Sequence, residues 1–288
     1  MIAVYKRELS ACFKSMPGYL FTAFLLLFTG VYVMVYNLSG YSANFEYALS
    51  AVSFIYMIAV PVLTMRTMAE EKKQKTDQLL YALPLRMSQV VLGKYLALCT
   101  VLLIPCLIMA AYPLLLSLWG TVNLPTAYGA LIAFFLLGAA LLSVGLFVSA
   151  MTENQVASAV ITLICMLILY LTGDLAAYLS PMSRASLIAL CIAVAVICAL
   201  LYLLCKNLFT SLVLCAAGVI AVYWYYVAEP LVFYGLFANI LRSLSLFDRF
   251  YTFINGVFDL RHAVYFLSFA AVFLLLTVQA LEKRRWAE

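Results

Sequence analysis

The chain alternates between long apolar stretches and short polar connections along nearly its whole length. The hydrocarbon core of a bilayer takes roughly 20 apolar residues per helix, so each such stretch predicts one membrane-spanning helix. We therefore expect an all-α polytopic integral membrane protein with about eight transmembrane helices, which form a single membrane domain over residues 1–288. The stretches cover residues 19–37, 47–65, 93–118, 127–150, 156–178, 186–204, 209–228 and 263–281. The pair 186–204 and 209–228 is separated by only a few residues and could form a tight hairpin, tilt or re-enter the membrane.

The first 16 residues carry a helical pattern instead of a continuous apolar run. Their apolar side chains recur at helical spacing, and most of the polar ones fall on the opposite side. This pattern is typical of an amphipathic helix that lies on a membrane surface. We expect such an entry helix over residues 1–16, with a bend at Pro17 and Gly18 into the first span.

One densely charged block, residues 66–86, interrupts the apolar pattern with the sequence RTMAEEKKQKTDQLLYALPLR. At helical spacing, Glu70 can pair with Lys73, and Glu71 can pair with Lys75. A cluster of charges between spans otherwise poor in charge indicates contact with a soluble partner on the cytoplasmic side. The alternative is an ordinary solvated loop with one helical turn.

A short helix is predicted at the end of this block. Thr76 is a suitable N-cap and is followed by an acidic residue, which favours a helix start. Leu79, Leu80 and Leu83 then line one side, and Pro84 ends the helix. An exposed leucine edge of this kind would fit a groove on another protein.

A second segment, residues 229–262, is too apolar for a free loop and too polar for a span. Interfacial or re-entrant half-helices fit this composition best, because irregular backbone at membrane depth must be buried in protein or face water. We expect the segment to pack over the outer ends of the spans.

Composition and charge agree with a membrane protein in the cell (cytoplasmic) membrane. Of the residues, 67% are hydrophobic and 10% are charged. With a cytoplasmic N-terminus, 13 of the 17 Lys and Arg residues fall on the cytoplasmic side, as the retention of basic loops predicts. Both termini are then cytoplasmic. The net charge of +5 therefore reflects topology and membrane lipids as neighbours, and it gives no reason to expect nucleic acid as a partner.

The sequence offers little catalytic chemistry. No P-loop motif occurs, so we expect no ATP hydrolysis by this chain alone, no bound cofactor and no enzyme activity. His262 is the only histidine, and we interpret it as a helix-entry residue. Cys191, Cys198 and Cys205 recur every seventh residue. A packing seam of small residues explains them better than a soft-metal path, and we expect no metal site.

Both ends of the chain and the charged block resemble a known family. With these elements, the chain resembles the membrane subunit of type-2 ABC exporters, the ABC-2 permeases, and most closely their gliding-motility and nitrous-oxide-reductase-maturation branch. Between about 120 and 230 the resemblance lies in hydrophobicity more than in motifs. The matching positions are Lys6, Glu8, Phe13 and Ser15; Leu63 to Arg66; Glu70, Glu71 and Lys72; Thr76, Leu79, Leu80 and Pro84; Gly93 and Lys94; and Phe250, Gly256, Asp259 to Arg261, Tyr265 to Ser268 and Leu281 to Trp286.

The resemblance implies a permease subunit that couples ATP hydrolysis to substrate movement. A separate cytoplasmic ABC ATPase would bind ATP and Mg, and a second permease subunit would complete a homo- or heterodimer. The ATPase-coupling residues would be Glu70, Glu71, Thr76, Gln78, Leu79, Leu80 and Leu83. The external segment would gate the exit through Leu231, Phe237, Asn239, Arg242, Asp259 and Arg261.

The chain departs from the family at several points. The family pattern in the block is approximately E-E-R-x-x-G-T-x-E-x-L-L, whereas this chain has Lys75 in place of the glycine and Gln78 in place of the second glutamate. The contact surface is therefore more basic, and a salt bridge from position 78 is in doubt. The family usually has six spans, and the excess here falls on residues 186–228.

Two other functions are compatible with the sequence. The first is a mechanical or scaffolding ABC-type complex that acts on an envelope partner without passing a solute. The second is an ATP-independent carrier, which predicts ionisable residues near the membrane midplane, with inverted repeats as a further sign. Neither feature is evident, so the carrier ranks last.

Overall fold

The computed structural model describes residues 1–14, 16–40, 43–76, 86–118, 120–178, 183–205, 208–229 and 231–287. Within these ranges every regular element is a helix, which confirms the all-α expectation. The chain divides into two compact units, one formed by Met1–Tyr170 with Leu246–Glu288 and the other by Leu171–Ser245. The single membrane domain that the sequence suggested stays a prediction.

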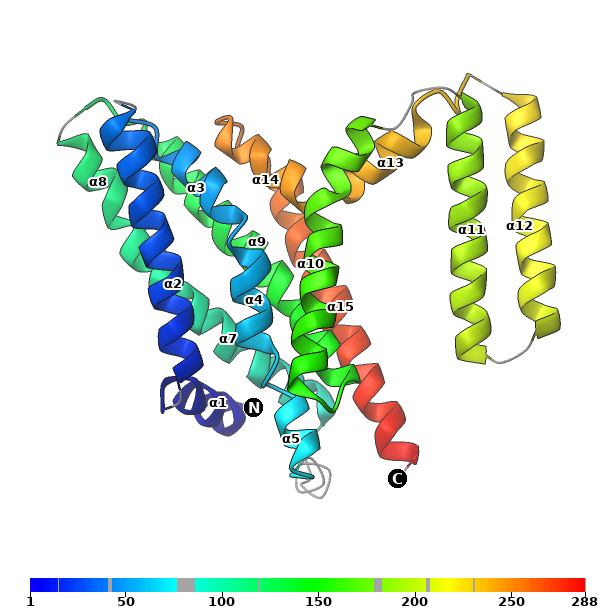
Figure 1. Cartoon of the computed structure of the whole chain (residues 1–288), viewed down its shortest axis with the longest axis horizontal. Coiled ribbons are helices and arrows are strands. Elements are labelled where there is room, and N and C mark those ends of the chain that lie inside the picture. Colours follow the sequence, from blue (N-terminus) through cyan, green and yellow to red (C-terminus); the bar gives the residue numbers. More distant parts are fainter. Residues whose placement is uncertain are drawn as a thin grey trace. The chain divides into compact units, whose positions relative to one another are not determined.

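The larger unit contains most of the helices. They are α1 (Ile2–Lys14), α2 (Met16–Val33), η1 (Met34–Ser39), α3 (Phe45–Ser53), α4 (Tyr56–Thr64), α5 (Ala69–Lys73), α7 (Met87–Met109), α8 (Ala111–Ser117), α9 (Leu124–Met151), most of α10 (Gln155–Tyr178), α14 (Leu246–Ile254) and α15 (Leu260–Ala287). Both termini lie at the same end of this unit as α1 and α5 (Figure 1). The smaller unit contains the end of α10, α11 (Ser183–Cys205), α12 (Leu208–Ala228) and α13 (Leu236–Leu244).

Five helices in the described residues are long and apolar enough to cross a membrane: Met16–Ser39, Met87–Ser117, Leu124–Met151, Gln155–Tyr178 and Leu260–Lys283. The bent pair α3 and α4 makes a sixth if it counts as one span. These six agree with six of the eight expected spans. The other two expectations fall in α11 and α12, whose described apolar stretches, Ser183–Ile192 and Val213–Ala228, are shorter. Those two spans stay predictions.

Helix α9 forms the centre of the larger unit and packs against α3, α4, α7, α14 and α15. Small residues allow this close approach. A Cβ atom at Gly138 would lie 2.8 Å from the Tyr56 ring, and one at Gly145 would lie 2.4 Å from the Thr64 hydroxyl. The Tyr56 hydroxyl donates a hydrogen bond to the Phe134 carbonyl oxygen at 3.1 Å. The small residues of the fourth expected span therefore do mediate helix packing.

Two of the expected spans are interrupted. The second is split into α3 and α4, which meet at an angle of 55°. The third breaks at Ala110, between α7 and α8, with Pro105 before the break and Pro113 after it. Because proline has no N–H to donate to the preceding turn, the two prolines explain why the helix is not continuous there.

Helix α1 crosses the base of the larger unit and lies against α7 and α2. Gly93 makes the contact with α7 possible, because a Cβ atom there would be 3.2 Å from both the Met1 carbonyl oxygen and the Val4 Cβ. The Tyr5 and Thr100 hydroxyls are hydrogen-bonded at 3.1 Å. The expected N-terminal helix is present, and it covers the start of the third span.

In the smaller unit, α11 and α12 pack side by side. A Cβ atom at Gly218 would lie 2.8 Å from Val194, so glycine permits this packing. Phe233 is buried against the rings of Tyr225 and Tyr226. Helix α13 contacts α11 but buries none of its own residues.

The segment 229–262 contains two short helices, α13 and α14. That they are external and interfacial or re-entrant stays a prediction. The backbone between them is extended at Ser245. The two helices belong to different units, and α14 is the better packed, with Leu246, Phe247, Phe250 and Phe253 all buried.

Candidate functional site

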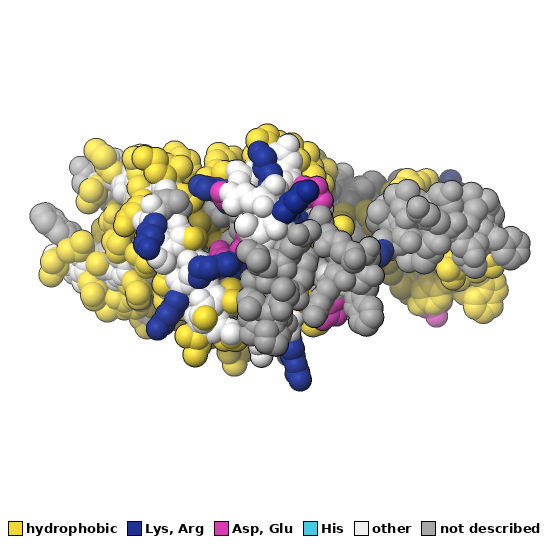
Figure 2. Space-filling model, turned by 90° about the horizontal axis from the view of Figure 1, so that it is seen from below, with side chains coloured by type: hydrophobic (Ala, Val, Ile, Leu, Met, Phe, Trp, Pro, Cys, Tyr) yellow, Lys and Arg dark blue, Asp and Glu magenta, His cyan; other side chains and the backbone are white. Residues whose placement is uncertain are grey.

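Charged side chains gather at the end of the larger unit that carries α1 and α5. Lys and Arg side chains spread over this face, with acidic side chains between them (Figure 2). Three separate segments meet here: helix α1, the turn from α4 into α5, and the first turns of α7. The candidate site is the cluster of ion pairs that joins them.

Lys94 is the centre of this cluster. Its side chain is fully buried, at 0% exposure. The ammonium group lies 3.0 Å from Glu8 Oε1 and 2.8 Å from Glu71 Oε2, and it donates to the Thr67 carbonyl oxygen at 2.7 Å. A lysine ammonium has three donors, and each has an acceptor here. The buried charge is therefore fully compensated.

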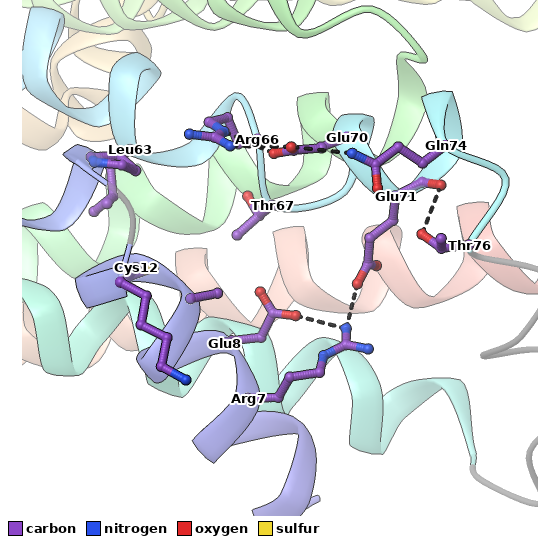
Figure 3. A pocket seen from close by; sticks show the side chains of 13 residues that line it. Arg7, Glu8, Cys12, Leu63, Arg66, Thr67, Glu70, Glu71, Gln74 and Thr76 are labelled. Carbon is purple, nitrogen blue, oxygen red and sulfur yellow. Dashed lines mark hydrogen bonds and ion pairs between the residues drawn. The ribbon is translucent and has the colours of Figure 1, made fainter.

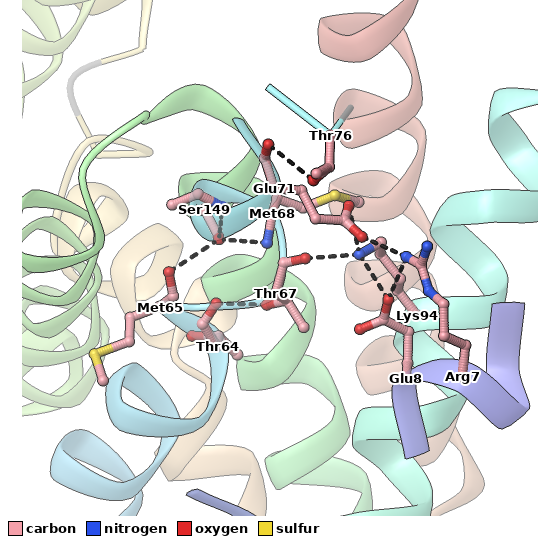
Figure 4. Close-up of polar contacts among 11 residues, drawn as sticks. Arg7, Glu8, Thr64, Met65, Thr67, Met68, Glu71, Thr76, Lys94 and Ser149 are labelled. Carbon is pink, nitrogen blue, oxygen red and sulfur yellow. Dashed lines mark hydrogen bonds and ion pairs between the residues drawn. The ribbon is translucent and has the colours of Figure 1, made fainter. Parts of the chain in front are cut away.

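Arg7 completes the cluster on its exposed side. Its guanidinium contacts Glu8 Oε1 at 2.8 Å and also pairs with Glu71 (Figure 4). Two cations and two carboxylates thus form one neutral network, which we call the four-charge cluster: Arg7, Glu8, Glu71 and Lys94. Because it joins α1, α5 and α7, none of these elements can separate from the others without breaking ion pairs in a partly dehydrated setting.

Further polar contacts fix the turn between α4 and α5 to the end of α9. The Ser149 hydroxyl accepts the backbone N–H groups of Met68 and Ala69 at 3.1 and 3.2 Å. Buried Lys72 donates to the Ala150 carbonyl oxygen. Carbonyl groups at a helix C-terminus attract cations, so Lys72 binds α9 at a favourable place. The polar connection therefore extends from α5 into the central helix.

A cavity of about 650 Å³ lies beside the four-charge cluster, between α1 and the α4–α5 segment (Figure 3). On its wall Arg66 binds Glu70 through two parallel contacts, Nε to Oε2 at 2.8 Å and Nη2 to Oε1 at 3.1 Å. Such bidentate pairs are strong and directional. Other lining residues are Arg7, Glu8, Ala11, Cys12, Lys14, Pro17, Leu63, Thr67, Glu71, Gln74 and Thr76.

Helix α5 ends in a Schellman motif whose key position is Lys75. The N–H of Thr76 donates to the Glu71 carbonyl at 3.0 Å, and the N–H of Lys75 donates to the Lys72 carbonyl at 3.1 Å. Lys75 has φ 56, the left-handed conformation that this motif requires and that normally selects glycine. This conformation suits the glycine of the family pattern that the chain resembles, and this chain keeps the turn with a strained lysine.

The structure changes the charge pairing that we expected in the block. Glu70 pairs with Arg66 and not with Lys73. Glu71 pairs with Arg7 and Lys94 and not with Lys75. Both expected pairs were wrong. Lys75 lies beyond the end of α5 at Lys73, so helical spacing does not bring it to Glu71. Glu70 and Lys73 share α5, but the Glu70 carboxylate is held by Arg66 instead. Glu71 points to other elements instead.

Thr76 lies in the turn after α5, and its hydroxyl donates to the Glu71 carbonyl oxygen at 3.2 Å. Four further coupling predictions, Gln78, Leu79, Leu80 and Leu83, lie outside the described residues, as does the short helix expected there. Of the coupling residues, the structure therefore places Glu70, Glu71 and Thr76 together on the wall of one cavity.

The residues expected to gate the exit do not form one cluster within either unit. Leu231, Phe237, Asn239 and Arg242 belong to the smaller unit, and Leu231 is 88% exposed. Asp259 and Arg261 belong to the larger unit, where Asp259 Oδ1 accepts the backbone N–H of Arg261 at 2.8 Å. Asp259 thus caps the start of α15. The gate itself stays a prediction.

His262 lies in the first turn of α15, as the helix-entry interpretation expected. Its Nδ1 is hydrogen-bonded to the Thr252 hydroxyl at 2.8 Å, which joins α15 to α14.

Sequence reasoning missed Arg7 as a site residue and did not assign roles to Glu8 and Lys94. Glu8 and Lys94 were among the positions that resemble the family, but only the fold shows that they touch. A signal was present: Lys94 lies within the expected third span, and an ionisable residue there needs a partner.

A comparison with protein families identifies the family of the chain. A family model described as ABC-2 family transporter protein matches residues 13–213, which is more than half of the chain. The chain belongs to the ABC-2 transporter family. No match to a curated protein was found. The family match includes Glu71 and Lys94, whereas Arg7 and Glu8 precede it.

In this ABC-2 transporter, the four-charge cluster should show strong coupling between its members. Replacing Lys94 alone by Met leaves two carboxylates facing one cation, and the loss should be roughly 3 kcal/mol. Glu71→Gln alone should also destabilise the protein. The double variant restores neutrality, so its thermal midpoint in detergent should lie above the value expected from adding the two single effects.

A matched control is Lys6→Met, which removes an exposed lysine of α1 outside the cluster and should leave the midpoint nearly unchanged. Strictly additive effects of Lys94→Met and Glu71→Gln would show that the buried contact has no energetic role.

The strained turn gives a second prediction. Lys75→Gly should raise the thermal midpoint of the ABC-2 transporter, because a left-handed conformation costs a residue with a Cβ atom about 1 kcal/mol. Lys75→Ala keeps the Cβ atom and should not produce the gain. At the neighbouring position, Gln74 has φ −86, so Gln74→Gly should lower the midpoint. Equal midpoints for Lys75→Gly and Lys75→Ala would contradict the strain at Lys75.

Proposed function

We propose that this chain is the permease subunit of an ATP-driven ABC-2 exporter in the cell membrane, with both termini in the cytoplasm. The end of the larger unit that holds α1, α5 and the termini is rich in Lys and Arg (Figure 2). Segments with this bias are retained in the cytoplasm. A separate ATPase that binds ATP and Mg would approach this end.

The observation that carries the proposal is the position of Glu71. It lies on α5, a few residues before the predicted Thr76 to Leu83 helix that we assign to ATPase binding, and it reaches Lys94 on α7 and Arg7 on α1. A partner that pulls on the segment would therefore act on α7 and α1 through ion pairs.

The cost of breaking the ion pairs favours movement of α5 together with α1 and α7 over movement of α5 alone. Separating Glu71 from fully buried Lys94 would leave an uncompensated charge in an apolar setting, which costs several kcal/mol. Moving α1, α5 and α7 together avoids this cost. Nucleotide-driven closure of the ATPases would thus move the start of the third span and, through Lys72 and Ser149, the end of α9.

In the working assembly two permease subunits would form a dimer, each bound to one ATPase through Gln78, Leu79, Leu80 and Leu83. The residues that resemble the gliding-motility and nitrous-oxide-reductase-maturation branch support membership of that branch. Leu231, Phe237, Asn239 and Arg242 on the external segment would gate the exit, with Asp259 and Arg261 near the start of the last span.

Co-purification tests the ATPase assignment. The chain is expressed with its neighbouring reading frames, and a P-loop protein should co-purify with the tagged wild type. Replacing Leu79 and Leu80 together by Asp should abolish this association, because charge on the leucine edge prevents its burial in a groove.

A control is Leu118→Asp, which adds one aspartate at a 78% exposed leucine just after α8, at the other end of the larger unit. This variant should keep the ATPase. Retention of the ATPase by the Leu79 and Leu80 variant would overturn the coupling assignment.

A further inference from the structure

The cavity beside the four-charge cluster has a charge imbalance that the ion pairs do not remove. Each carboxylate on its wall already pairs with a cation. Glu8 and Glu71 pair with Arg7 and Lys94, and Glu70 pairs with Arg66. Lys14, which also lines the cavity, forms no ion pair within the described part of the chain. Among the residues that the structure describes, and counting Lys94 behind the wall, four cations face three carboxylates. The site therefore has room for one negative charge.

The cations are of the kinds that bind phosphate. Arg66 and Arg7 present guanidinium groups, which form directed contacts with phosphate oxygens. Their side chains are 37% and 53% exposed, so they remain accessible although each already holds a carboxylate. Lys14 adds an exposed ammonium group. At about 650 Å³ the cavity falls in the size range of small-ligand sites.

The surroundings indicate a lipid as the source of this anion. The cavity includes Pro17, at the start of α2, the first apolar span. From there α2 presents large apolar side chains to its surroundings, with Tyr19, Leu20 and Leu27 each more than half exposed. A molecule with a charged head and apolar tails could therefore use both the cavity and the helix surface.

We propose that this cavity binds the phosphodiester monoanion of an anionic phospholipid from the adjacent leaflet, with Lys14 as the residue that supplies the unpaired charge. The phosphate would lie between Lys14 and the exposed guanidinium edges of Arg66 and Arg7. Its acyl chains would extend along α2. The lipid would thereby bridge α1 and the α4–α5 segment, and it does not require that an ATPase be bound.

Native mass spectrometry of the full chain in detergent tests the proposal with defined probes. Phosphatidylglycerol should bind to one tight site, several-fold more tightly than phosphatidylcholine with the same chains. Lys14→Gln should weaken this binding about fivefold, since one basic residue near an anionic lipid is worth about 1 kcal/mol. Lys6→Gln, on the same helix but outside the cavity, should change it less than twofold.

A second variant tests the role of the cavity's volume separately from the role of its charge. Ala11 lines the cavity and is exposed, so Ala11→Trp should fill the space without altering any charge and should also weaken phosphatidylglycerol binding. An unchanged thermal midpoint without lipid verifies that each variant is folded. Equal losses in Lys6→Gln and Lys14→Gln, or no loss in Ala11→Trp, would overturn the site in favour of diffuse surface attraction.

The source of the phosphodiester is tested with soluble probes. Glycerophosphoglycerol, which has the head group without acyl chains, and inorganic phosphate should both compete only weakly with phosphatidylglycerol. Competition by either at concentrations similar to the lipid would overturn the lipid assignment and identify the site as one for a free anion.

Discussion

Everything at the basic end of this molecule depends on how one buried charge is compensated. Lys94 has no exposed surface, and it lies on a helix that is otherwise long and apolar enough to cross a membrane. An isolated ammonium group there would be very costly, so acceptors must come from elsewhere in the chain. Glu8 and Glu71 supply the charge, and the Thr67 carbonyl supplies the third hydrogen bond.

This requirement determines the arrangement of the neighbouring elements. Because the acceptors belong to α1 and to the α4–α5 segment, neutralising Lys94 brings an amphipathic helix, a connecting turn and a membrane span into contact. The α1 helix can approach because position 93 is glycine. The cavity, with Lys14 on its wall, lies beside the four-charge cluster that joins α1 and α5.

The sequence predicted the helices well but not the contacts that join them. Six expected spans agree with helices or a bent helix pair because membrane thickness imposes a length that hydrophobicity reveals. The ion pairs of the four-charge cluster were not predicted. Glu8 and Lys94 are 86 positions apart, and helical spacing cannot detect such a pair. The family resemblance marked Lys75 as an unusual residue, but only the backbone explains that glycine is favoured there by the Schellman turn.

The central claim is that α1, α5 and the start of α7 move as one body. The eight native cysteines are replaced, and spin labels are attached at Ala11→Cys on α1 and Lys73→Cys on α5. Pulsed electron resonance then measures the distance between the two labels. The distance within one chain should be the same in the nucleotide-free complex and in the ATP-trapped complex, while the Lys73→Cys distance between the two permease copies changes. A changed distance between α1 and α5 within one chain would contradict the account.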